Sequence, residues 1–209
     1  MKNYLTEALG TFFLVLVIWL TVSTGSEFAP LAIGSILMVM VYAGGYISGW
    51  HYNPAVTLWA TIAGKLPNKE VIPYIISQII WAFLAAIVSY VLVGEVLIVA
   101  PASGSLQAII AELIFTFALV YVVLNTAASE ATEGNSNYGL AIWFTVMTAA
   151  YAVGGISWWA FNPAVAVGPQ LFDFIKWGMS ISTVWIYLVA CFWWAILAAL
   201  RYNFMNNNK

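Results

Sequence analysis

Charged side chains are scarce in this sequence. Of 209 residues, 6 are lysine or arginine and 8 are aspartate or glutamate, whereas 64% are hydrophobic. A soluble domain carries roughly a quarter charged residues, which form its polar surface. The composition therefore predicts a protein of the lipid bilayer. With a net charge of −2, it also lacks the basic face that nucleic-acid binding requires.

Cysteine is nearly absent as well. Cys191 is the only one and lies within an apolar run, which excludes a disulfide framework. The sequence also contains no phosphate-binding glycine loop, no cluster of metal ligands and no nucleophile–base set. We therefore predict that the protein is not an enzyme and has no catalytic residues, no metal and no cofactor.

Long apolar runs are what the sequence has in abundance. A membrane helix needs about 20 mostly apolar residues. Six runs meet this requirement, at about residues 4–23, 30–50, 71–92, 105–124, 138–157 and 179–201. The first run carries Glu7 and lacks a small-residue cleavage site, which favours a membrane span over a signal peptide.

Two further apolar pieces, about 54–63 and 163–172, are too short to cross a bilayer. Each begins with proline preceded by asparagine. Asparagine is a good helix N-cap, and proline suits the first helical position because its missing N–H is not needed there. We predict that both pieces are half-helices that re-enter the membrane.

The chain contains an internal repeat. ISGWHYNPAV at 47–56 matches ISWWAFNPAV at 156–165, and EALGTFFLV at 7–15 resembles ELIFTFALV at 112–120. We predict one channel domain, 1–209, made of repeat 1 (about 4–92), a link (about 93–104) and repeat 2 (about 105–202). Three spans per repeat turn the second copy upside down, and inverted repeats with broken helices place a site near the bilayer midplane.

Basic residues suggest the orientation of the chain. With both termini on one side, five of the six basic residues fall on that side, and only Lys176 falls on the other. Lysine and arginine are enriched in cytoplasmic loops. We therefore predict a multi-pass protein of a plasma or cell membrane with cytoplasmic termini.

The two Asn-Pro-Ala segments indicate a pore. Inverted symmetry brings the half-helix N-termini together, and each carries about half a positive charge. Backbone outside regular helices is tolerated at membrane depth where it lines a wet cavity. We predict that the amides of Asn53 and Asn162 point into a lumen and donate hydrogen bonds to a solute oxygen, and that the paired positive helix ends repel cations.

The motifs SGWHYNPAV and FNPAVAVGP, with the glutamate-bearing first and fourth spans, resemble the major intrinsic protein family, the aquaporins and glycerol facilitators. The resemblance covers nearly the whole chain. It implies an aquaporin-like all-α membrane fold, a right-handed bundle of six spans and two half-helices that assembles as a homotetramer with one pore per subunit. It also implies that Glu7 and Glu112 hold the pore loops by accepting backbone N–H bonds, and that the pore motifs are Asn53, Pro54, Ala55 and Asn162, Pro163, Ala164.

The resemblance further implies an outer constriction at Ile33, Ala150, Trp159 and Val165. Most of the family has arginine at the place of Val165 and glycine at that of Trp158. A guanidinium would repel cations and donate hydrogen bonds. Without it, we predict an apolar filter that admits small neutral solutes such as glycerol, urea or ammonia, and that can dewet.

Several alternatives stay open on the sequence. The leading interpretation is a passive channel for water or small uncharged solutes. A coupled secondary transporter shares inverted repeats, and a structural membrane protein would have its pore closed by Trp158 and Trp159. His51 is either a pH-sensitive gate or a loop histidine bonded to backbone. Lys176 either replaces the missing arginine or is a solvated charge at the rim.

Overall fold

The computed structural model describes residues 1–95, 97–179 and 181–206. Within this part of the chain, six helices are long and apolar enough to cross a membrane. A helix satisfies its own backbone N–H and C=O groups, which hydrocarbon cannot do. The chain is therefore an integral, multi-pass, all-helical membrane protein. These long helices are α1 (Lys2–Ser23), α2 (Ala29–Ser48), α4 (Val71–Val93), α5 (Ser105–Val123), α6 (Tyr138–Ser157) and α8 (Val184–Asn206).

Two shorter helices follow the Asn-Pro pairs. α3 (Pro54–Ile62) has 9 residues and α7 (Pro163–Trp177) has 15. At about 1.5 Å per residue they are roughly 14 and 22 Å long, less than the roughly 30 Å of a hydrocarbon core. Neither can span the membrane alone. Three short helical segments lie in the connections between these helices: η1 (Asn68–Glu70), η2 (Leu124–Ala128) and η3 (Glu130–Thr132).

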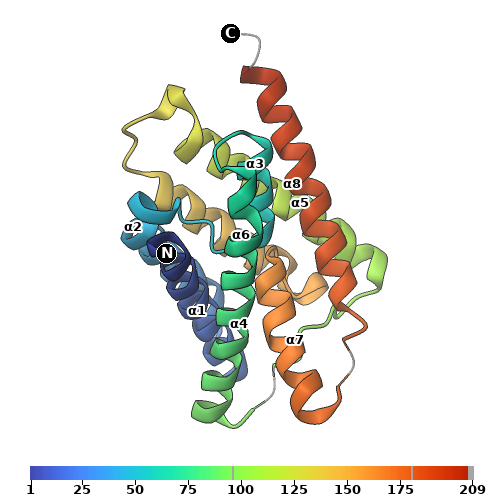
Figure 1. Cartoon of the computed structure of the whole chain (residues 1–209). Coiled ribbons are helices and arrows are strands. Elements are labelled where there is room, and N and C mark those ends of the chain that lie inside the picture. The colour runs from blue at the N-terminus through green and yellow to red at the C-terminus, as the bar shows by residue number, and fades with distance from the viewer. Residues whose placement is uncertain (96, 180, 207–209) are drawn as a thin grey trace.

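The half-helices pack across the molecule. Helices α1, α2 and α4 form one group, α5, α6 and α8 form another, and α2 meets α6. α3 packs mainly against α8, and α7 packs mainly against α4, beside which it lies in Figure 1. Gly168 of α7 lies so close to Ala82 of α4 that an added Cβ would collide with the α4 backbone. Small residues allow such close helix approach in lipid, so each half-helix is seated on the opposite group.

The predicted end of the second half-helix is wrong. The sequence predicted helix over 163–172, whereas α7 continues to Trp177. Asp173, the first residue after the predicted end, is buried. The Lys176 ammonium lies 3.5 Å from the centroid of the Tyr90 ring on α4. Both polar residues therefore fit within the packed helix.

The predicted last span, 179–201, is shifted by about five residues from α8, which covers Val184–Asn206. Just before its start, the Thr183 hydroxyl donates to the Val99 carbonyl and to Gln170 Oε1. These contacts fix Thr183 in the turn that precedes the helix. At its end, the Asn203 amide donates to the Ile62 carbonyl at 2.9 Å. Side-chain contacts, which hydropathy does not report, set both boundaries.

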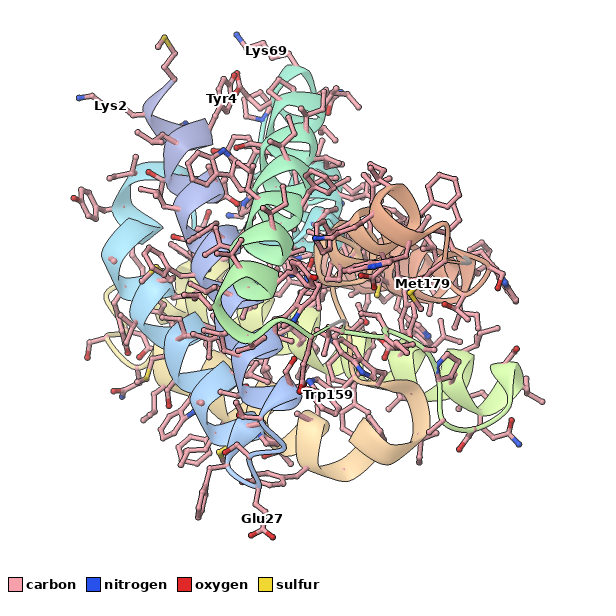
Figure 2. All side chains as sticks on the ribbon, turned by 90° about the horizontal axis from the view of Figure 1, so that it is seen from below. Lys2, Tyr4, Glu27, Lys69, Trp159 and Met179 are labelled. Atoms are coloured by element: carbon pink, nitrogen blue, oxygen red, sulfur yellow. The ribbon has the colours of Figure 1, made fainter. Side chains whose placement is uncertain are left out.

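The two ends of the bundle are distinct. Lys2, Tyr4 and Lys69 lie at one end in Figure 2, and Glu27 lies at the other. The Tyr4 hydroxyl donates to Glu70 at 2.7 Å, which ties the N-terminal helix to the connection between α3 and α4. Three parts of the chain lie together at the top of Figure 1: the connection between α3 and α4, the connection between α5 and α6, and the C-terminal end of α8.

Candidate functional site

Asn53 and Asn162 begin the two half-helices and meet at their ends. Each is an N-cap in extended backbone, and its Oδ1 accepts from the N–H two residues later, at 2.9 Å. Each Nδ2 donates to the opposite loop, from Asn53 to the Phe161 carbonyl and from Asn162 to the Tyr52 carbonyl, both at 2.9 Å. The two loops are therefore joined by a reciprocal pair of hydrogen bonds, with the positive ends of α3 and α7 facing this junction.

This geometry changes the predicted role of the two amides. The sequence predicted that both donate to a solute. An amide NH₂ group carries two donors, and one donor of each asparagine is bound to the opposite loop. One N–H on each side chain is left for a solute.

Glu7 of α1 holds the first loop from inside the membrane. It is fully buried. Its Oε1 accepts from the Ser48 hydroxyl at 2.6 Å and from the His51 N–H at 3.0 Å. Its Oε2 accepts from the Tyr52 N–H at 2.6 Å and from the Gln78 amide at 2.8 Å. A carboxylate within a span needs such partners, and here they include two consecutive backbone N–H groups of the loop.

Glu112 of α5 occupies the equivalent place on the second loop. It is also fully buried. Its Oε1 accepts from the Ser157 hydroxyl at 2.7 Å and from the Ala160 N–H at 2.9 Å. Its Oε2 accepts from the Phe161 N–H at 2.7 Å. The resemblance implied this contact for both glutamates, and the structure places both carboxylates within hydrogen-bond distance of the loop backbone.

Both loops adopt left-handed backbone at matching positions. Gly49, Trp50 and Tyr52 have φ of 85°, 52° and 47°. In the second loop, Trp158, Trp159 and Phe161 have φ of 72°, 44° and 43°. Left-handed backbone costs roughly 1–2 kcal/mol for a residue other than glycine. The hydrogen bonds to the glutamates hold the loops in this conformation, including at Trp158, where glycine would be unstrained.

The loops leave backbone acceptors free. Within the described residues, no hydrogen bond reaches the carbonyls of Trp50 and His51, or those of Trp159 and Ala160. All four residues line one cavity between the loops. An unpaired carbonyl in hydrocarbon costs several kcal/mol, so these oxygens indicate a place where water or a solute binds.

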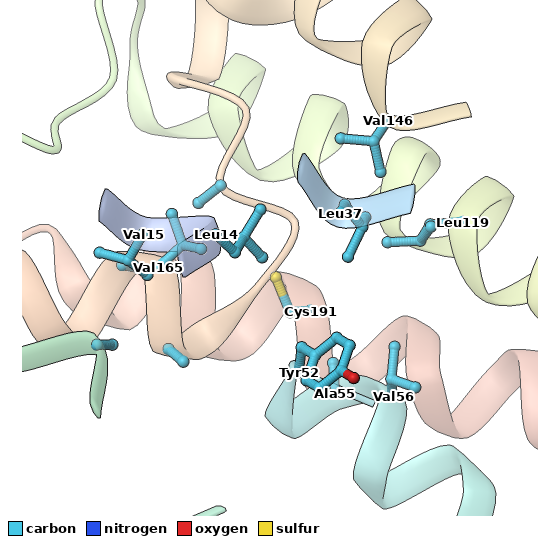
Figure 3. Close-up of a cluster of buried hydrophobic side chains, with 14 of the residues drawn as sticks. Leu14, Val15, Leu37, Tyr52, Ala55, Val56, Leu119, Val146, Val165 and Cys191 are labelled. Atoms are coloured by element: carbon cyan, nitrogen blue, oxygen red, sulfur yellow. The ribbon is translucent and has the colours of Figure 1, made fainter. Parts of the chain in front are cut away.

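The cavity is small and mostly apolar, with a volume of about 50 Å³. In Figure 3, Leu37, Leu119 and Val146 point toward one another from α2, α5 and α6. The cavity's polar side chains are His51, Asn53 and Asn162, and its aromatic residues include Trp50, Tyr52 and Trp159. Its aliphatic wall consists of Leu14, Ile18, Ile33, Leu37, Val41, Val56, Leu119, Val123, Ile142, Val146 and Val165.

Of the four predicted constriction residues, three line this cavity: Ile33, Trp159 and Val165. Ala150 is buried but lies outside the described wall, to which α6 contributes Ile142 and Val146 instead. Residues 146 and 150 share one helix face. Ala150 lies one helical turn beyond Val146 on α6.

Trp159 carries a polar group at the constriction. Its indole stacks on Trp158, with centroids 5.4 Å apart and planes 3° from parallel. The indole N–H is buried and has no hydrogen-bond partner within the described chain. A buried unpaired donor costs roughly 1–3 kcal/mol, which the packing of this indole must offset.

His51 and Lys176 were left open by the sequence. His51 Nδ1 lies 3.1 Å from the Thr57 hydroxyl, so its ring is bonded to a side chain and not to backbone as the second alternative held. Lys176 is exposed and lies over the Tyr90 ring. It is not among the residues that line the cavity, so it does not stand in for the missing arginine.

Replacing Lys176 with methionine should therefore leave transport almost unchanged. The cation–π contact with Tyr90 is worth about 0.5–1 kcal/mol at an exposed site, so a small loss of thermal stability is the expected effect. Solute flux into proteoliposomes should change by less than about twofold. A tenfold change in flux would instead place this ammonium in the permeation path.

The chain matches the family model described as "Major intrinsic protein" over residues 1–202. It is 36% identical to "Glycerol uptake facilitator protein-like 6" of Lactiplantibacillus plantarum, over 95% of each chain. It is 34% identical to "Aquaporin NIP1-1" of Arabidopsis thaliana, over 97% of this chain and 73% of that protein. The fold is similar to the aquaglyceroporin from Plasmodium falciparum, with a TM-score of 0.84 at 21% identity over 97% and 95% of the two chains.

Proposed function

The chain belongs to the major intrinsic protein family of membrane channels, and we propose that it is a passive pore for small neutral solutes with an apolar filter in place of a charged one. The observation that carries this proposal is the pair of pore loops. Asn53 and Asn162 meet at one cavity, which the residues carrying the unpaired carbonyls of both loops also line.

Donors and acceptors in this cavity suit a small polar molecule without charge. Each asparagine retains one N–H donor, and four loop carbonyls are free acceptors within the described residues. A hydroxyl or amide group can use both kinds of partner at once. The positive ends of α3 and α7 meet at the same place and repel cations.

The filter that we propose is apolar and consists of Ile33, Trp159 and Val165, with Ala150 next to it. Of these, Trp159 alone has a polar group in its side chain, and that N–H is buried. Apolar walls bind solutes weakly, which fast passage requires. They also disfavour a strongly hydrated molecule compared with one that has an apolar face, such as glycerol.

A coupled transporter is less well supported by this fold than a passive pore is. Proton-coupled transport needs ionisable groups in the membrane that can exchange protons with the lumen. Glu7 accepts four hydrogen bonds and Glu112 accepts three, from the loops and neighbouring side chains. These contacts suit a bracing role and leave the carboxylates little freedom to exchange protons.

We extend the proposal to the surroundings of the pore. Repeats 4–92 and 105–202 form one domain, and the protein assembles as a homotetramer with a pore in each subunit, as the family relationship suggests. Lys2, Lys65 and Lys69 belong to the end of the bundle that also carries the C-terminal end of α8, and this supports cytoplasmic termini.

A flux measurement tests the proposal. Purified protein in proteoliposomes should admit glycerol and urea at rates that rise linearly with the gradient and exceed those of empty vesicles. Sodium or proton gradients should have no effect, because a passive pore couples to neither. Stopped-flow light scattering gives these rates. Saturable uptake that follows an ion gradient would indicate a coupled transporter, and no uptake would indicate a structural protein.

A further inference from the structure

Trp50 and Trp159 occupy equivalent positions, three residues before Asn53 and Asn162. The backbone N–H of Trp50 donates to the Ser48 hydroxyl, and that of Trp159 donates to the Ser157 hydroxyl, at 3.4 and 3.2 Å. These are the serines whose hydroxyls bond to the two bracing glutamates. The same local contacts therefore position both indoles.

Each indole is also fixed by packing. The Trp50 ring lies against Gly45 of α2, where an added Cβ would collide with it. It stacks on Tyr138 with centroids 5.3 Å apart. The Trp159 ring lies against Gly154 of α6 in the same way and stacks on its neighbour Trp158. A glycine on one side and an aromatic ring on the other leave each indole little freedom to swing away.

Trp50 lies where the central cavity opens toward one end of the molecule. Beyond the central cavity are a chamber of about 280 Å³, which Lys65 and Trp59 help to line, and a vestibule of about 660 Å³, which the connection between α5 and α6 borders. Among the described residues, Trp50 is the one that lines all three spaces. Trp159 lines the central cavity and neither of the other two spaces.

We propose that Trp50 is a second specificity-determining residue, an indole constriction at the opposite end of the lumen from Trp159. The inference rests on the proposed pore and adds to it that selection by size occurs twice. A solute that passes one indole meets an equivalent one before it leaves. The two constrictions act in series, so the narrower of them limits which molecules cross.

Series constrictions predict a distinctive pattern for variants. A solute too large for either indole stays excluded when one indole is removed, and it crosses when both are removed. For a small solute, removing one of two similar resistances raises the flux by at most about twofold. If Trp159 were the only filter, removing its indole would be sufficient to admit the large solute, and removing Trp50 as well would add nothing.

The experiment uses Trp50→Gly, Trp159→Gly and the double variant, because glycine suits the left-handed backbone at both positions. Trp193→Ala is the matched control, since Trp193 of α8 is 61% exposed on the outer face. Glycerol and xylitol influx into proteoliposomes is followed by stopped-flow light scattering. We expect xylitol near the background of empty vesicles in wild type, in both single variants and in the control, and a rise of about tenfold in the double variant.

A double variant that carries xylitol no faster than the faster single variant overturns the inference. If wild type carries no glycerol, the proposed function itself fails, and the two failures are thereby distinguished. Gel filtration in detergent checks assembly. Should a glycine variant fail to assemble, Trp50→Leu and Trp159→Leu give the same comparison with smaller openings, and their double variant should again exceed both singles.

Discussion

Replacing Glu112 with alanine is expected to abolish transport and to remove much of the protein's stability. The substitution leaves three buried donors unpaired, the hydroxyl of Ser157 and the N–H groups of Ala160 and Phe161. Each unpaired donor costs about 1–3 kcal/mol, so the total destabilisation is roughly 3–9 kcal/mol. The second loop then loses the contacts that hold its left-handed backbone, and with it the position of Asn162.

Glutamine at position 112 provides the graded comparison. Its carbonyl oxygen still accepts hydrogen bonds, but its NH₂ group cannot, so Glu112→Gln should retain part of the flux and unfold between wild type and Glu112→Ala. Glu27→Ala, at an exposed turn, removes a carboxylate without touching a loop. Thermal unfolding followed by gel filtration, together with glycerol flux, measures both effects. Wild-type stability and flux in Glu112→Ala would show that the carboxylate does not brace the loop.

The spans between long polar breaks were the most predictable part of the fold. The sequence predicted 71–92 and 138–157, and the structure has Val71–Val93 and Tyr138–Ser157. In each case a turn-rich break adjoins an apolar run, and the backbone must be helical in hydrocarbon. The region around α7 was less predictable, because the burial of Asp173 and the bonding of Thr183 depend on helices distant in sequence.

The wall of the cavity could be predicted in part from the repeat. Asn53 and Asn162 are 109 positions apart, and the same spacing relates Ile33 to Ile142, Leu37 to Val146 and Val56 to Val165. All of these residues line the cavity. Applied to the predicted constriction, the spacing gives Ile142 from Ile33 and Val56 from Val165. It does not give Leu119, whose counterpart at this spacing is Gly10, or the pair Leu37 and Val146, because neither member was predicted.

Spacing does not predict which side chains reach the lumen. Val41 and Ala150 are also related by 109 positions, yet Val41 lines the cavity and Ala150 does not. The two backbones occupy equivalent places, and the side chains differ in length. The prediction for Ala150 came from a family resemblance in backbone position, which does not fix how far a side chain extends.

Equivalence of the two halves extends to the residue after each motif. Val56 and Val165 both line the cavity, and both are almost fully buried, at 4% and 2% exposure. A lumen with valine at both places presents similar apolar surfaces to a solute from either end. An arginine at one of them would make the lumen polar and charged on one side.

Replacing Val165 with arginine is accordingly expected to raise the ratio of water to glycerol permeability by about tenfold, mainly through a loss of glycerol flux. A guanidinium carries five N–H donors, and the free carbonyls of Trp159 and Ala160 lie on the same cavity. These acceptors offset part of the roughly 2.5–3.5 kcal/mol that a central arginine costs in a membrane. The side chain would occupy much of a cavity of about 50 Å³, leaving room for water but not for a polyol.

Val165→Met separates charge from length. Methionine extends into the lumen without charge or strong donors, so it should slow water and glycerol together and change their ratio by less than about threefold. Stopped-flow measurements on the same proteoliposomes give both permeabilities, and their ratio does not depend on the amount of protein reconstituted. If Val165→Arg admits every solute that wild type admits, at an unchanged ratio, then Val165 does not take part in selection. The filter would then lie with the indoles alone, since they are the remaining rigid groups on the lumen.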